Sequence, residues 1–193
     1  MLEKEEKIIQ IICYLLKNLN REISKTHLMK LIFFADKYHL LKFGTTITED
    51  DIYAMKNGPL SSIAKKLLEP ENHGEAAQLL RYYIKEEKNY EYTFNTSKNI
   101  DFDLFADSEF LALNFIIQET DKYWKTFNDA INYSHEYPEW KQYEEFFKIH
   151  KRGRKLLRLE ELFSCFKGDI ISESIPKGHV EITKEMALNS CFG

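Results

Sequence analysis

The sequence predicts a mainly α-helical (α+β) fold with about seven or eight helices and one small antiparallel β-sheet or hairpin. In most of the chain, apolar residues recur every three or four positions, as on the buried face of an amphipathic helix. Between residues 89 and 105, aromatic and polar residues instead alternate on both sides of a polar turn, which is typical of a hairpin. The chain has 193 residues, of which 44% are hydrophobic and 30% charged, and we expect residues 1–193 to form a single domain.

The first two predicted helices are the clearest local signals. Residues 5–19 place isoleucines and leucines on one face and lysines on the other. Ser24 is a favourable N-cap for the next helix, and Gly44 permits the left-handed conformation that ends it. Because Phe33 and Phe34 widen the apolar face of this second helix, we expect it to be buried on most sides.

Shorter elements are predicted in the middle of the chain. The tripeptide Asn57-Gly58-Pro59 is a turn signal, with a short apolar run before it and a helical pattern after it. The expected elements are a strand at residues 52–55, helices at residues 60–68 and 75–84, and two hairpin strands at residues 90–94 and 100–104.

The second half of the chain contains further helix-start signals. Thr126 and Asp129 have the spacing of a capping box, and Pro138 suits the first turn of a helix. The expected elements are a long helix capped by Asp107, helices that begin at Thr126 and Pro138, a helix over residues 156–166, a short strand at residues 169–172 and a last helical turn after Thr183.

Composition and motifs exclude several classes of function. A net charge of −4 argues against a dedicated nucleic-acid-binding protein, and no apolar run reaches the length of a membrane span. Cys13, Cys165 and Cys191 are widely spaced and odd in number, so they predict neither a disulfide framework nor a zinc site. The first residues are charged rather than signal-like, and the sequence contains no glycine-rich phosphate loop or hydrolase motif. We therefore expect a cytoplasmic protein that is not an enzyme and binds no cofactor or metal.

One basic run is a candidate binding site. Residues 148–158 contain six lysines and arginines and no acidic residue, so they could bind phosphates or an acidic groove on a protein partner. Glutamates on both sides of the run favour the alternative of solvated, locally balanced charges. The candidate anion or nucleic-acid patch is Lys151, Arg152, Arg154, Lys155 and Arg158. A further alternative is an enzyme whose substrate contains a phosphate, which Arg152, Arg154 and Lys155 would bind.

A DNA-binding transcriptional regulator is the alternative function. A helix, a second helix led by Ser24 and a later tyrosine-rich hairpin have the order of a winged helix-turn-helix. Residues 28–35 are too apolar for a major groove, because a recognition helix needs exposed polar residues that face base edges. Nucleic acid is therefore not the expected partner.

Three short motifs occur in a characteristic order: LMKLIFFA at residues 28–35, AMKNGPL at residues 54–60 and SHEYPEW at residues 134–140. They are similar to an L-x-K-L-L-Y-x-A helix, a short strand that runs into Gly-Pro, and an [ST]-H-x-x-x-x-W element. Together they resemble the Panacea domain of SocA-like antitoxins and phage-associated GepA-like proteins, over about residues 5–150. Residues 151–193 are an unmatched C-terminal extension, and Met55 and Asp36 depart from the tryptophan and glutamine common in that family.

The resemblance implies an antitoxin that neutralises a toxin encoded nearby, in a bacterial or prophage genome, by direct protein–protein contact. It also implies a second route, in which the chain delivers its toxin as an adaptor to an energy-dependent protease. Homodimerisation stays open. We expect structural roles for the motif residues. Gly58 provides a turn that a residue with a Cβ would strain, and Pro59 begins the following helix. His135 forms a hydrogen bond across the Pro138 turn, and Trp140 is a core anchor.

Aromatic side chains are the expected interface anchors, since tyrosine, tryptophan and phenylalanine are enriched in binding surfaces and make up 14% of this chain. Four tyrosines are concentrated near the predicted hairpin, and three motif residues could line a shallow recognition site. The candidates are Tyr82, Tyr83, Tyr90 and Tyr92 in the first group, and Tyr53, Asn57 and His135 in the second.

Overall fold

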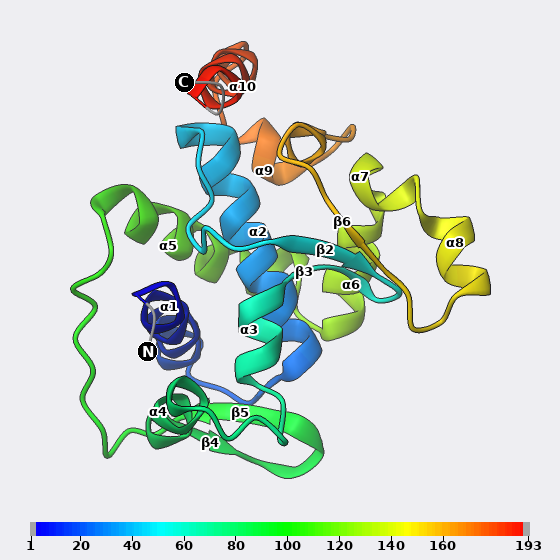
Figure 1. Ribbon diagram of the computed structural model, residues 1–193. Helices are drawn as coiled ribbons and strands as arrows, with labels where there is room; N and C mark the ends of the chain where they lie inside the picture. The colour runs from blue at the N-terminus through cyan, green and yellow to red at the C-terminus, as the bar shows by residue number, and fades with distance from the viewer. Residues whose placement is uncertain (1–2, 191–193) are drawn as a thin grey trace.

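The computed structural model describes residues 3–190 (Figure 1). Helices dominate, which confirms the predicted mainly-α fold class, and two three-stranded antiparallel sheets occur where one was expected. Among these residues there are ten α-helices rather than seven or eight, because several helices span only four to six residues. The α-helices are α1 (Glu3–Leu19), α2 (Lys25–Phe43), α3 (Ser62–Leu67), α4 (Glu75–Tyr83), α5 (Asp107–Tyr123), α6 (Phe127–Glu136), α7 (Pro138–Lys141), α8 (Glu144–Ile149), α9 (Ile170–Glu173) and α10 (His179–Ser190). The strands are β1 (Ile23–Ser24), β2 (Ile52–Met55), β3 (Gly58–Ser61), β4 (Ile84–Glu86), β5 (Glu91–Phe94) and β6 (Arg154–Leu156), and the 3-10 helices are η1 (Lys88–Tyr90) and η2 (Glu161–Phe163).

Helix α2 is the centre of the fold, with the other helices arranged around it (Figure 1). Every residue from His27 to Leu41 is buried, as expected for a helix that is apolar on most sides. Helices α5, α6, α9 and α10 and strand β3 all contact it. Both ends form as predicted: Ser24 accepts a hydrogen bond from the backbone N–H of His27, and Gly44, at φ 85°, donates its own N–H to the carbonyl oxygen of Leu40.

The first sheet has the strand order β1-β5-β4 and contacts α1 through β5. The second half of the predicted hairpin is wrong: β5 pairs with β4 and β1, and residues 100–104 form no strand. Residues 100–102 have no regular secondary structure and residues 103–104 form a turn, and this segment packs against α1. Gln10 accepts the backbone N–H of Leu104, and the ring of Phe102 packs edge-on against Tyr14, 5.0 Å between centroids.

The second sheet has the order β3-β2-β6, and its β2–β3 hairpin turns at Lys56 and Asn57. The helix predicted over residues 156–166 is wrong. Within residues 156–166, only the short 3-10 helix η2 forms. Leu156 is the last residue of β6, which pairs with β2, and the Leu157 N–H donates to the carbonyl of Ile52, so no helix begins there. This pairing joins residues about 100 positions apart in the chain, so no local pattern could predict it.

Pro59 is a strand residue rather than the start of a helix. It lies in β3, at the edge of the sheet, where the missing N–H of proline is tolerated. The following helix begins at Ser62, with Ser61 as the N-cap that accepts the N–H of Ala64.

Helix starts in the second half of the chain follow local capping chemistry. Thr126 and Asp129 form the predicted capping box of α6, and Pro138 is the first residue of α7. For α5 the N-cap is Ala106 instead of Asp107, and the carboxylate of Glu109 accepts the Ala106 N–H.

The C-terminal extension returns to α2. The strand predicted at residues 169–172 is wrong, because the carboxylate of Asp169 caps helix α9 instead. In α10, Thr183 Oγ1 donates to the carbonyl of Leu41 over 2.8 Å, and His179 Nε2 donates to that of Lys42 over 2.7 Å. Cys191 lies outside the described residues. Within residues 3–190, no helix combines the length and apolar character that a bilayer crossing needs.

Candidate partner-binding site

A buried lysine anchors the β2–β3 hairpin to α2. Lys30 is 1% exposed, and its Nζ donates to the carbonyl oxygen of Pro59 over 2.6 Å. Gly58, at φ +93°, lies so close that a Cβ added there would be 2.8 Å from this Nζ. Burial lowers the pKa of Lys30 well below its usual range, because removal from water disfavours the charged ammonium. These three motif residues therefore fix the hairpin onto the central helix.

Trp140 and His135 support the same hairpin. The indole Nε1 of Trp140 donates to the carbonyl of Met55 over 2.7 Å, and the His135 ring stacks on Trp140 with centroids 3.4 Å apart. The hydrogen bond predicted for His135 across the Pro138 turn is wrong, since Nε2 is buried without a hydrogen-bond partner among the described residues. Burial and, to a smaller extent, the nearby Lys30 lower the pKa of His135 to about 4, so the imidazole is neutral at pH 7.

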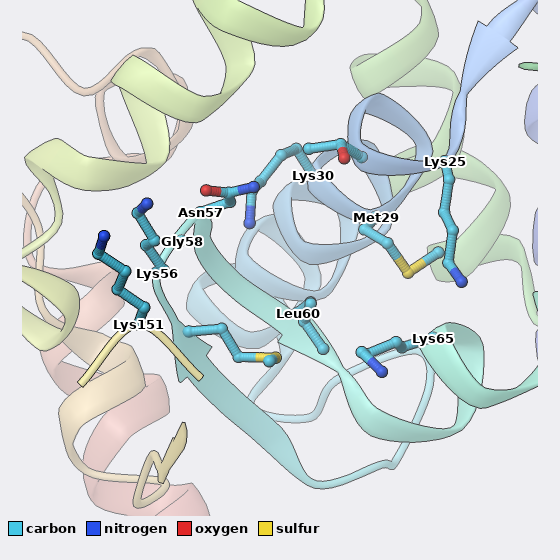
Figure 2. Close-up of a pocket in the computed structure, with 11 residues that line it drawn as sticks. Lys25, Met29, Lys30, Lys56, Asn57, Gly58, Leu60, Lys65 and Lys151 are labelled. Carbon is cyan, nitrogen blue, oxygen red and sulfur yellow. The ribbon is translucent and has the colours of Figure 1, made fainter. Parts of the chain in front are cut away.

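An open pocket of about 280 Å³ lies between the first turns of α2, the β2–β3 hairpin and residue 151. We call it the lysine pocket, because five of its lining residues are lysines and none is acidic. Figure 2 shows two of these lysines on one side and two on the other, with apolar side chains between them. The lysines are Lys25, Lys30, Lys56, Lys65 and Lys151, and the apolar residues are Met29, Met55 and Leu60.

The lysines differ in how firmly they are held. Lys25 Nζ donates to the carbonyl of Leu68 over 2.9 Å, and burial lowers the pKa of this lysine. Lys65 forms an ion pair with Glu69. Lys56 and Lys151 are exposed, so their charges lie at the rim of the lysine pocket.

A second hollow of about 300 Å³ adjoins the lysine pocket and shares Met55, Leu60 and Lys65 with it. It adds the cations Lys66 and Arg154. The two hollows together make a basic track that follows the β2–β3 hairpin.

The sequence-predicted motif residues lie partly on this surface. Asn57 is exposed and lines the lysine pocket. Tyr53 is half-buried and lines the second hollow, where the guanidinium of Arg154 lies 4.7 Å from its ring centroid. His135 is not among the residues that line either hollow, and stacks on Trp140 instead.

The four tyrosines near the first sheet do not form one surface. Tyr82 and Tyr90 are exposed, at 52% and 57%, and Tyr83 is half-buried. The prediction that Tyr92 anchors a partner is wrong, because its side chain is 3% exposed and belongs to the hydrophobic core. Strand β5 turns Tyr92 inwards against the fold, whereas Tyr90 precedes the strand.

The predicted basic patch is divided by the structure. Arg154 and Lys155 are neighbours on β6, so they point to opposite faces of the sheet: Arg154 over Tyr53 and Lys155 over the ring of Phe146. Arg158 pairs with Glu160 and Glu161, and Arg152 is exposed. Of the five residues, Lys151 alone lines the lysine pocket.

The winged-helix interpretation does not fit the structure. Its recognition helix would be α2, which is buried from His27 to Leu41 and so cannot enter a DNA groove. Within residues 3–190, no group of three or more His, Cys, Asp or Glu side chains could bind a metal ion.

Sequence reasoning missed most of the lysine pocket. Lys25, Lys56 and Lys65 come from α2, the hairpin turn and α3, and no spacing in the sequence relates them. Lys56 was the one sequence signal for this pocket, because it precedes the Asn57-Gly58-Pro59 turn within the motif at residues 54–60.

The comparisons with known proteins agree with the motifs. Residues 28–141 match the family model described as antitoxin SocA-like, Panacea domain. Searches of curated proteins and of solved structures gave no match. The matched span is more than half of the chain and contains all three motifs, from Leu28 in α2 to Trp140. The chain therefore belongs to the SocA-like antitoxin family with a Panacea domain.

Proposed function

We propose that this chain is the antitoxin of a toxin–antitoxin pair and neutralises a toxin encoded beside it by direct protein–protein binding. Membership of the SocA-like antitoxin family supports an antitoxin-type role. We further propose that the pair acts in the cytoplasm of a bacterium and that the chain performs no catalytic step of its own.

The lysine pocket is the observation that carries this proposal. The motif residues Lys30 and Gly58 form part of its wall, and Trp140 binds the hairpin that forms another part. A family motif that builds a surface hollow, rather than only a core, favours a binding function for that hollow. Its apolar side chains between exposed charged ones follow the layout of a protein–protein contact, in which an apolar centre has a polar rim.

The test is co-expression of the chain with the product of the adjacent gene in a bacterial host. We expect the neighbour alone to stop growth, co-expression to restore it, and an affinity tag on the chain to recover both proteins in a stable complex. Restored growth with loss of the toxin protein would indicate that the chain acts as an adaptor for a protease and not by direct neutralisation. Toxicity without rescue would refute the antitoxin function.

A second exposed surface provides a comparison within the same experiment. Tyr82 in α4 and Tyr90 in η1 are exposed and line neither hollow, and Lys98 Nζ lies 3.8 Å from the ring centroid of Tyr82. If the lysine pocket is the binding surface, the double variant Tyr82→Ala/Tyr90→Ala should still rescue growth. Loss of rescue in a folded double variant would move the toxin-binding surface to these tyrosines.

A further inference from the structure

We infer that the lysine pocket binds an acidic segment of the partner protein, in which carboxylates flank an apolar side chain. This inference rests on the proposed function, because it names the chemistry of the toxin segment that the antitoxin binds.

Charge is the first argument. The whole chain has a net charge of −4, yet the lysine pocket is lined by five lysines and no carboxylate. Lys30 is buried and bound to Pro59, and Lys65 is already paired with Glu69, so the pocket cations without an ion-pair partner among the described residues are Lys25, Lys56 and Lys151. A local positive field on an acidic protein attracts a negatively charged partner to this face and repels it elsewhere.

The arrangement of these cations is the second argument. In Figure 2, Lys56 and Lys151 lie on one side of the lysine pocket and Lys25 and Lys65 on the other. Met29 and Leu60 lie between the two pairs. A single small anion would need charges that converge on one point. Cations on two separated sides, with Lys25 on one and Lys56 and Lys151 on the other, instead fit carboxylates at two positions along a chain.

The apolar base is the third argument. Met29, Met55 and Leu60 give the lysine pocket a base without charge. Methionine side chains adapt their shape to a ligand, which suits an apolar side chain inserted between the two carboxylates. An inorganic anion would gain nothing from this surface.

The adjoining hollow is the fourth argument. It extends the site past Leu60 towards Lys66 and Arg154, and its one carboxylate, Glu69, is paired with Lys65. The basic track is therefore longer than one side chain, which favours an extended acidic segment over a compact ligand.

The experiment measures the Kd of the full-length chain for the purified toxin, by calorimetry at low and high salt. Lys56→Glu/Lys151→Glu reverses the two exposed rim charges without removing core packing. The matched control is Lys177→Glu/Lys184→Glu, with the same change of net charge. These control lysines are close in sequence to His179 and Thr183, which bind the last turn of α2. That turn is about 26 Å along the helix axis from Lys25 in the lysine pocket.

We expect the rim variant to weaken toxin binding by about tenfold or more and to reduce its salt dependence, and the control to stay within about twofold of the wild type. Lys56→Gln/Lys151→Gln should give an intermediate loss, and thermal melts should show that all variants fold. Equal toxin affinity of the rim variant and the control would overturn the inference.

Two further outcomes are distinguishable. Pyrophosphate titrated into the chain alone should show no saturable binding; tight binding that the rim variant loses would overturn the acidic segment in favour of a small-anion site. Absence of any complex between the wild-type chain and the toxin would instead refute the proposed function itself.

Discussion

Gly58→Ala tests how the hairpin is anchored to the central helix. Two independent costs can be worked out at this position. A φ of +93° is unfavourable for a residue with a Cβ, which costs about 1–3 kcal/mol. The added Cβ would also lie closer than 3.0 Å to Ser134 Oγ and to Lys30 Nζ, and such overpacking costs about 1–3 kcal/mol. We therefore expect the free energy of unfolding to fall by about 2–6 kcal/mol.

The assay is urea unfolding followed by circular dichroism, with Ser134→Ala as the partner variant. The Ser134 hydroxyl donates to the carbonyl of Ile131 over 2.8 Å, so Ser134→Ala alone should cost about 1 kcal/mol. In the double variant the clash with Oγ is gone, and the loss should be smaller than the sum of the single losses by about 1 kcal/mol or more. A loss below about 1 kcal/mol for Gly58→Ala, or strict additivity, would refute this account.

Three other predictions concern buried side chains and their hydrogen bonds. Burial raises the pKa of Asp36 from 3.8 to about 7, so its protonated carboxyl favours the folded state below about pH 4. This stabilisation is lost as the pH rises through 7. Asp36→Asn should therefore make the free energy of unfolding less dependent on pH over that range. Tyr92→Ala should cost about 3–5 kcal/mol and Tyr82→Ala less than about 0.5, measured by chemical unfolding, and equal losses would contradict the burial difference. Trp140→Phe should cost about 1–3 kcal/mol through the lost hydrogen bond to Met55, and an unchanged unfolding midpoint would show that this bond does not stabilise the hairpin.

Elements with local causes were predicted well. Helix α2 was located from Ser24 to Gly44 because the N-cap, the apolar faces and the left-handed stop are all encoded within a few residues of one another. The capping box of α6 and the proline at the start of α7 belong to the same class. Strand β2 was also predicted with its observed bounds.

Elements with distant partners were predicted poorly. The helical spacing of residues 156–166 starts at the last residue of β6, whose backbone pairs with β2, about 100 residues earlier in the chain. The segment at residues 100–104 alternates like a strand, yet it pairs with no strand, and its Phe102 ring packs against Tyr14 of α1 instead. Tyr90 and Tyr92 are two residues apart and were treated alike, although Tyr90 is exposed and Tyr92 is 3% exposed.

The sequence by itself therefore determined the mainly helical fold class, the principal helix ends and, through three short motifs, the family. The tertiary structure alone decided which side chains meet in the lysine pocket. Its lysines come from α2, the hairpin turn, α3 and the segment before β6, and no spacing in the sequence relates them. Helix caps and hydrophobic periodicity act over a few residues, whereas a binding pocket depends on packing between segments far apart in the chain.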